Sequence, residues 1–202
     1  HTIGRRQRQM CIRDRVSVST ARSLSDTTTG TVTGTITSGT TIAAMLDENT
    51  GLIETDAYTI TIAAGDAEAT AKDLTALYGK TSVAVDASAV TQITGTVAEA
   101  NIVYAAGSSE ITGLGNEAVV TTESSLADVT ALNTLDGNTT GTVNTATITS
   151  VTGTLAKLLT AYGSNGITGL GNEAITVSDT ITLAASDPVS YTHLTLPTTY
   201  GV

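Results

Sequence analysis

Short stretches in which aliphatic residues alternate with small polar or hydroxyl residues recur along the chain and predict β-strands. Three of them are Tyr58–Ile62, Thr147–Val151 and Ala174–Val177. Successive side chains of a strand point to opposite faces, so the alternation places the aliphatic side chains on one face. Shorter apolar stretches at residues 82–85, 111–114 and 141–143 predict a second set of strands.

Between the strands, apolar residues follow the spacing of a helix face. Positions i, i+3, i+4 and i+7 are apolar at Leu155, Leu158, Leu159 and Tyr162. Residues that can cap a helix N-terminus come before such stretches, at Asp66, Thr96, Ser124 or Ser125, and Thr154. A glycine suited to a helix C-terminus follows, at Gly79, Gly107, Gly137 and Gly163. Residues 40–46 predict one further helix.

One octapeptide, ITGLGNEA, occurs twice, at residues 111–118 and again at residues 167–174. The interval between the copies divides into two nearly equal steps, from Val119 to Ile148 and from Ile148 to Ile175. Steps of similar length back along the chain reach Val90 and Ile60, so these five residues occupy the same position in successive coils. Four positions before each of these stand Asp56, Asp86, Gly115, Asn144 and Gly171. Asp, Gly and Asn tolerate the left-handed backbone region, so we expect a tight turn at this point of every coil.

This order of elements predicts an α/β solenoid. Each coil of about 28 residues would hold short parallel strands and one short helix, and residues 16–187 would form about five to six coils. Helices this short are marginal alone, so each must bury one face against its neighbours. A pure parallel β-helix without helices is the alternative fold.

The two ends of the chain differ from this pattern. Residues 1–15 contain RQMCIRDR, and residues 188–202 contain VSYTHLTLPTT. Both resemble translations of sequencing adapters, so we expect these two segments not to belong to the natural protein.

The charge of the repeat region limits its partners. Residues 16–187 hold four Lys and Arg against 18 Asp and Glu. This acidic balance argues against nucleic acid and anionic membranes as partners. No apolar run approaches the length needed to span a bilayer, so we also expect no membrane insertion.

The repeat region lacks two residue types on which much catalysis and metal binding depends. It contains no His and no Cys, which excludes a Ser-His-Asp or Cys-His nucleophile and a zinc site of the usual kind. Glu117 and Glu173 occupy equivalent positions, as do Asp56 and Asp86, and we interpret all four as solvated turn residues. Asn116 and Asn172 are expected to stack in a structural ladder. We assign no catalytic, cofactor-binding or metal-binding residue and expect no enzyme.

Calcium is the ligand that best suits the remaining residues. Oxygen ligands gather in the turns at residues 47–51 and 136–139, although neither turn matches an EF-hand loop. Calcium is therefore kept as a possible ligand without an assigned site.

The octapeptide and the segment TLDGNTTGTVNTATITSVTGTLAKLLTAYGS resemble the Thr/Ala/Gly-rich tandem repeats of very large surface or secreted proteins of marine bacteria, cyanobacteria among them. The resemblance covers about residues 90–186. It implies a structural or adhesive segment of a large extracellular or cell-surface protein, with neighbouring repeats of the same chain and cell-surface glycans as candidate partners. The alternative is a calcium- or carbohydrate-binding solenoid module.

Overall fold

The computed structural model describes residues 15–53 and 56–179. This part of the chain contains one short 3-10 helix, η1 (Ala64–Asp66), and six α-helices: α1 (Val18–Ser25), α2 (Ile42–Leu46), α3 (Ala71–Tyr78), α4 (Val97–Ala105), α5 (Val129–Asn138) and α6 (Leu155–Gly163). Its thirteen strands are β1 (Arg15–Val16), β2 (Thr33–Ile36), β3 (Ala57–Thr59), β4 (Glu68–Thr70), β5 (Val85–Asp86), β6 (Gln92–Gly95), β7 (Ile111–Thr112), β8 (Ala118–Thr121), β9 (Ser125–Leu126), β10 (Val143–Asn144), β11 (Ser150–Gly153), β12 (Ile167–Thr168) and β13 (Ala174–Val177).

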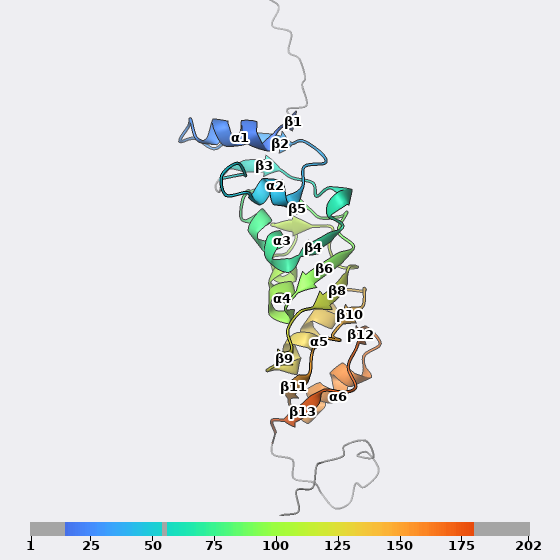
Figure 1. The fold of residues 1–202 in the computed structure, drawn as a ribbon. Coiled ribbons are helices and arrows are strands. Elements are labelled where there is room, and N and C mark those ends of the chain that lie inside the picture. Colours follow the sequence, from blue (N-terminus) through green and yellow to red (C-terminus); the bar gives the residue numbers. More distant parts are fainter. Residues whose placement is uncertain (1–14, 54–55, 180–202) are drawn as a thin grey trace, which may run out of the picture.

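Every strand pair within the described ranges is parallel, and the strands form several small sheets. Their orders are β1-β2-β3, β12-β10-β8-β6-β4, β13-β11-β9 and β5-β7. Figure 1 shows the resulting column, with the chain advancing from β1 at one end to β13 at the other and helices along its length. The predicted α/β character with parallel strands is confirmed, and the alternative fold without helices is wrong.

The strand registers correct the predicted coil length. Ile93 pairs with Val119, and Val119 pairs in turn with Val143, so both of these steps are shorter than the predicted one. At the start of the column Arg15 pairs with Thr35, which is a shorter step still. The predicted coil length of about 28 residues is therefore longer than the steps between these paired strands.

The true repeat consists of two coils. The segment β4-α3-β5-β6-α4-β7-β8 is followed by β9-α5-β10-β11-α6-β12-β13, in which each element has its counterpart in the same order. The pairing repeats as well, because Gln92 pairs with Ala118 as Ser150 pairs with Ala174. The first segment, β1-α1-β2-α2-β3, is a shorter form of the same unit. We call these segments the second, third and first unit.

The units are joined by the last strand of each one. β8 pairs with β6 of its own unit and also with β10 of the next unit. At the first junction, Thr61 just after β3 forms an isolated parallel bridge with Asp86 of β5. Asp86 and Asn144 consequently lie in strands, and the turn predicted at their positions is wrong.

The helix N-termini confirm part of the predicted capping. The side chains of Thr96 and Thr154 accept the N–H of the third helical residue, as expected. Asp128 caps α5 in place of Ser124 or Ser125, and Thr70 caps α3 in place of Asp66. The helix predicted at residues 40–46 is present as α2.

The helix ends agree only in part with the predicted glycines. Gly79 is the C-cap of α3, and Gly107 follows α4 with a φ of 69°. Gly163 is the last residue of α6, whereas Gly137 lies inside α5, which continues to Asn138.

The second helix of every unit receives a further carboxylate from outside its own coil. The first helical N–H groups of α2, α4 and α6 donate to Asp66 at 2.9 Å, Glu123 at 2.7 Å and Asp179 at 3.0 Å. Each acid lies beyond the strand that ends the unit. A negative charge at a helix N-terminus offsets its partial positive charge and binds an otherwise unpaired N–H.

The core is a continuous aliphatic stack between helices and strands. Leu74 and Leu77 of α3 and Leu132 and Leu135 of α5 are fully buried. Burial of one such side chain contributes about 1.5–3 kcal/mol. Since each coil exposes apolar surface that only its neighbours cover, the coils stabilise one another.

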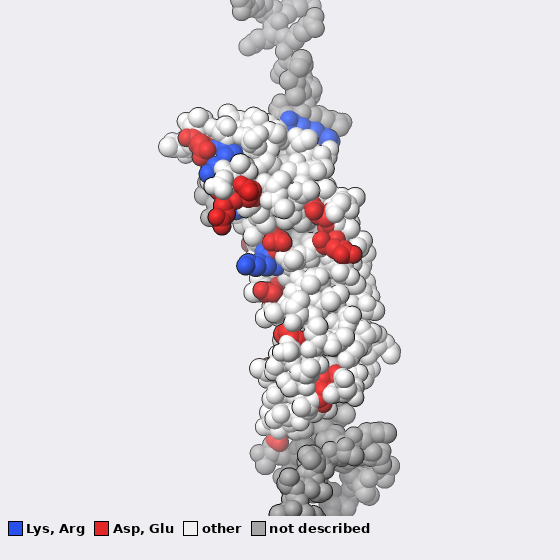
Figure 2. All heavy atoms as spheres, in the orientation of Figure 1, with Lys and Arg blue, Asp and Glu red and all other residues white. Residues whose placement is uncertain are grey.

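Acidic side chains are scattered along the face of the column shown in Figure 2, whereas the Lys and Arg atoms visible there lie in the half nearer β1. None of the helices in residues 15–53 and 56–179 has the length and apolarity needed to cross a bilayer. The segments 1–15 and 188–202, interpreted as adapter-derived, lie outside the described residues except for Arg15.

Candidate functional site

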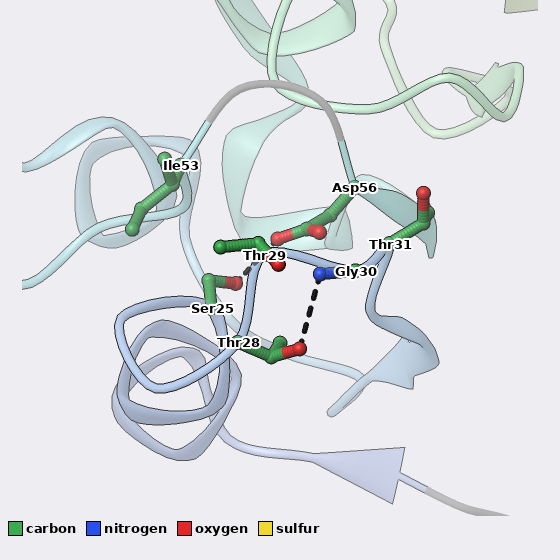
Figure 3. A pocket seen from close by; sticks show the side chains of 7 residues that line it. All are labelled: Ser25, Thr28, Thr29, Gly30, Thr31, Ile53 and Asp56. Atoms are coloured by element: carbon green, nitrogen blue, oxygen red, sulfur yellow. Dashed lines mark hydrogen bonds between the residues drawn. The ribbon is translucent and has the colours of Figure 1, made fainter.

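A polar cavity of about 330 Å³ opens between the first two coils. It is lined by Ser25, Thr28, Thr29, Gly30, Thr31, Ile53 and Asp56 (Figure 3). Ser25 comes from the end of α1 and Asp56 from the segment before β3, while the threonines belong to the loop between α1 and β2. The cavity therefore brings together residues far apart in sequence.

Asp56 is the charged group of this cavity, although only 4% of it is exposed. Its carboxylate accepts the N–H of Val32 at 2.8 Å, the hydroxyl of Tyr58 at 3.0 Å and the hydroxyl of Ser25. Burial acts to raise its pKa, but the three hydrogen bonds outweigh this effect and hold the pKa below its usual value. Asp56 is thus a stably ionised acceptor.

This arrangement suits structural anchoring better than proton transfer. A carboxylate with a lowered pKa is a weak base, and Ser25 would need a stronger one to become a nucleophile. The Ser25 hydroxyl also contacts Tyr58 Oη at 2.8 Å, and Tyr58 Oη lies 3.3 Å from the carbonyl oxygen of Ala21. The cluster therefore ties α1 to β3.

The repeated octapeptide builds a second polar cluster, in two copies. Glu117 turns back to accept the N–H of Gly115 at 2.8 Å and the hydroxyl of Tyr104 at 3.0 Å. Glu173 accepts the N–H of Gly171 at 2.8 Å and the hydroxyl of Tyr162 at 2.8 Å. The turn, the acid and the tyrosine of the preceding helix thus form one unit.

The backbone of the two octapeptides is the same as well. Gly113 and Gly115 have φ values of 83° and 129°, and Gly169 and Gly171 have 90° and 140°. A Cβ on Gly113 would lie 2.7 Å from the backbone nitrogen of Ser88 in the adjacent coil. This position requires glycine for its conformation and for the close approach of the two coils.

A groove of about 290 Å³ runs beside the first octapeptide. Its walls include Tyr104, Gly113, Leu114, Gly115 and Asn138. The Tyr104 hydroxyl is already bound to Glu117, and Asn138 donates its side-chain amide to Asn101 at 3.1 Å. Burial, together with the neighbouring Glu117 charge, raises the pKa of Tyr104 and keeps the phenol protonated.

In both segments considered for calcium, an aspartate carboxylate is already hydrogen-bonded within the protein. Asp47 Oδ1 accepts the N–H of Asn49 and both the N–H and the hydroxyl of Thr50, at 2.8 to 3.0 Å. Asp136 accepts the hydroxyl of Ser164 at 2.7 Å. Within residues 15–53 and 56–179, no three His, Cys, Asp or Glu side chains are grouped so that they could hold a metal ion.

Two expectations about the acidic and amide residues are wrong. Glu117 has no exposed surface and Asp56 almost none, so neither is a solvated turn residue. Asn116 comes just before β8 and Asn172 just after β12, and β10 lies between β8 and β12 in the sheet, so the two side chains cannot stack on each other. The tyrosine that precedes each octapeptide, Tyr104 or Tyr162, was the sequence signal for the hydrogen bond to the acid, but not for its burial.

Comparison of the chain with protein-family models, with curated proteins and with solved structures gives no match. The functional argument therefore rests on the residues and contacts described above.

Proposed function

We propose that this chain is a structural or adhesive repeat segment of a large extracellular or cell-surface protein. Its units form a solenoid that extends along one axis and presents a hydroxyl-rich surface. Its role is spacing and attachment, and no catalysis is assigned to it.

The observation that carries this proposal is the recurrence of one complete hydrogen-bonded unit. Tyr104, Gly115 and Glu117 are joined as Tyr162, Gly171 and Glu173 are, and in both copies the polar groups serve the turn itself. A catalytic or ligand-binding acid needs a free face, whereas these acids hold adjacent elements together. Repetition of a self-sufficient unit is typical of an array whose length matters.

The contacts between coils support the same role. Helices α2 to α6 contact one another in sequence order, and each strand pairs with the strand of a neighbouring coil. Such a stack can grow without changing the contacts already made. Its stability is then a sum of unit stabilities and nearest-neighbour interface energies.

The experiment is a change in repeat number. A second copy of residues 122–177 is inserted in frame after Val177, and the parent and extended chains are compared by small-angle X-ray scattering and chemical denaturation. Because the insert adds two coils, we expect the column to lengthen by about 10 Å, twice the roughly 4.8 Å strand spacing, and the free energy of unfolding to rise.

A matched control carries the same insert with Leu132 and Leu135 replaced by Asp, which prevents the inserted helix from burying its apolar face. This control should lengthen the chain without raising stability. If the unaltered insert behaves like the control, the units do not stack as a solenoid and the spacer proposal fails.

A further inference from the structure

We infer that one copy of this chain binds a second copy end to end, through two different and complementary faces. The C-terminal face consists of Leu159, Tyr162, Gly171, Glu173 and Ile175. The N-terminal face consists of Leu24 and residues 28–32. The inference rests on the stack of two-coil units proposed above and names a partner for these two faces.

The internal junction between the second and third units shows how such faces meet. The Thr139 hydroxyl donates to the carbonyl of Glu117 at 2.7 Å, and the N–H of Thr140 donates to the carbonyl of Gly115 at 2.8 Å. The turn after α5 therefore covers the carbonyls of the first octapeptide.

The junction between the first and second units uses the same device. The Thr81 hydroxyl, after α3, donates to the carbonyl of Tyr58 at 2.7 Å, and the N–H of Ser82 donates to the carbonyl of Asp56 at 2.9 Å. At both internal junctions, a threonine after the first helix of a unit thus donates its hydroxyl to a backbone carbonyl at or just before the last strand of the preceding unit.

The N-terminal face carries the same turn, and no carbonyl of the described residues accepts its first hydroxyl. Residues 28–32 and residues 139–143 both read TTGTV. In both, the glycine N–H donates to the hydroxyl of the first threonine at 3.0 Å. A Cβ on Gly141 would lie 2.2 Å from the carbonyl oxygen of Glu117, whereas one on Gly30 would meet only Thr28 Oγ1, at 3.5 Å. The same turn is packed in one place and open in the other.

The C-terminal face carries the matching acceptors. Gly171 has a φ similar to that of Gly115, and Glu173 accepts the same kinds of hydrogen bond as Glu117. Within residues 15–53 and 56–179, however, no group donates to the carbonyls of Gly171 and Glu173. The donors at one end of the column and the acceptors at the other end are those that meet at the internal junction.

Four of the six exposed large apolar side chains of the described residues lie at the same two faces. Ile175 is 45% exposed, although its counterpart Val119 is fully buried against β10. Leu24 is 46% exposed, although its counterparts Leu77 and Leu135 are fully buried. Leu159 occupies the position of Asn101, whose side chain donates to the Ala131 carbonyl in the next helix. Both faces therefore expose surface that the interior of the column covers.

Because the two faces differ, contact between them is head-to-tail and leaves one free face at each end. The test is sedimentation velocity of the full chain from low to high micromolar concentration. We expect the weight-average sedimentation coefficient to rise steadily with concentration. A single monomeric species at every concentration would overturn the inference.

Two single variants separate the faces. Ile175→Arg places a charge on the C-terminal face, and Leu24→Arg places one on the N-terminal face. Each should weaken association at least about tenfold, equivalent to about 1.4 kcal/mol. An equimolar mixture of the two should form dimers and nothing larger, because each variant retains one intact face. Equal association of the variants and the parent, or a mixture that stays monomeric, would contradict head-to-tail binding.

Ile102→Arg is the matched control, because Ile102 is 52% exposed on α4 in the middle of the column. It should leave association unchanged, and a loss equal to that of Ile175→Arg would show that the end faces are not involved. Thr28→Val should weaken association while Thr28→Ser retains it, because only the hydroxyl donates. A lengthened column in the repeat-number experiment, combined with a monomeric parent, would reject this inference alone and leave the spacer proposal intact.

Discussion

Tyr104 donates its hydroxyl to the Glu117 carboxylate at 3.0 Å, and this bond fixes the end of α4 to the turn that follows it. The same bond recurs between Tyr162 and Glu173 at 2.8 Å. The two pairs differ in their surroundings. Glu117 is fully buried beneath the next coil, while Glu173 is half-buried on the C-terminal face. Identical local sequences thus provide an internal comparison of one interaction at two depths.

We expect Glu117→Ala to destabilise the chain far more than Glu173→Ala. Loss of the Glu117 side chain leaves the Gly115 N–H and the Tyr104 hydroxyl without their acceptor in a buried site, at a cost of about 2–4 kcal/mol. Water can reach the corresponding groups beside Glu173, so that substitution should cost at most about 1 kcal/mol. Urea denaturation of both variants measures the difference, and equal losses would show that burial by the next coil does not matter.

The glycines of the octapeptide should differ in their tolerance of alanine. Gly113→Ala combines a left-handed backbone with a Cβ only 2.7 Å from Ser88 N, and it should cost about 2–4 kcal/mol. Gly115→Ala retains the unfavourable φ of 129° but meets no atom within 4 Å, so about 1–3 kcal/mol is expected.

Gly65→Ala is the control for these two substitutions, since its Cβ would also meet no atom within 4 Å. Its effect should stay within about 0.5 kcal/mol. Thermal melts of the three variants give the order, and a Gly113 variant as stable as the Gly65 variant would mean that adjacent coils are not in close contact there.

The sequence allowed the type of element to be predicted well and its position less well. Thr96 and Thr154 cap their helices because a threonine directly precedes an apolar helical pattern. Ser124 and Ser125 offered the same chemistry, but residues 125–126 pair with β11, so the helix begins only after Asp128. The start of α5 is therefore set by the pairing of β9 with β11 in a neighbouring coil, which the local sequence does not reveal.

The predicted coil length of about 28 residues matches only the average of the steps along the chain, for a physical reason that also explains the octapeptide spacing. Successive helix caps after Thr41 lie at Thr70, Thr96, Asp128 and Thr154, so long and short steps alternate along the chain. The long steps are those that include β3 or β8, the last strands of their units, after which the chain enters the next unit. An average step therefore conceals a repeat of two unequal coils.

The buried acids were the least predictable feature. A Glu in a Gly-Asn-Glu turn is expected to face water. Only the stacked coil, which places Thr139 over the Glu117 carbonyl, removes that water. The candidate cavity at Asp56 depends on the same kind of contact between coils, through Ser25 and Val32.

The carboxylate at the N-terminus of α4 should contribute to stability through its charge and its hydrogen bond. Glu123 lies in the following coil and accepts the Val97 N–H at 2.7 Å. Glu123→Ala should cost about 1–2 kcal/mol, because it removes both effects. Glu123→Gln retains an acceptor and should cost less than half as much. If the two variants are equally unstable in urea, neutral hydrogen bonding contributes nothing at this site.

Removal of calcium should leave the melting temperature unchanged. The Asp47 carboxylate caps its own turn, and the bonds from Thr50 and Asn49 hold its pKa below the usual value. Asp136 is bound to Ser164. Differential scanning calorimetry in excess EDTA and in excess Ca²⁺ tests this expectation. A melting temperature that rises with Ca²⁺ would favour a calcium-binding module over a purely structural array.

At alkaline pH, Tyr104 and Tyr162 should make the chain less stable than at neutral pH. Burial raises the pKa of both phenols, and the adjacent Glu117 and Glu173 raise it further. Above the ordinary tyrosine pKa of about 10, the unfolded chain releases these protons while the folded chain retains them. Their contribution is therefore fully present below about pH 10 and is lost as pH rises toward the folded-state pKa. Absorbance titration at the tyrosinate band should show these two groups ionising above the ordinary tyrosine pKa, together with unfolding. Tyr104→Phe should be about 1 kcal/mol less stable at neutral pH, since it lacks the bond to Glu117, but its stability should fall less steeply above pH 10. Ionisation of all tyrosines in one step while the chain stays folded would contradict the buried pairing of tyrosine with glutamate.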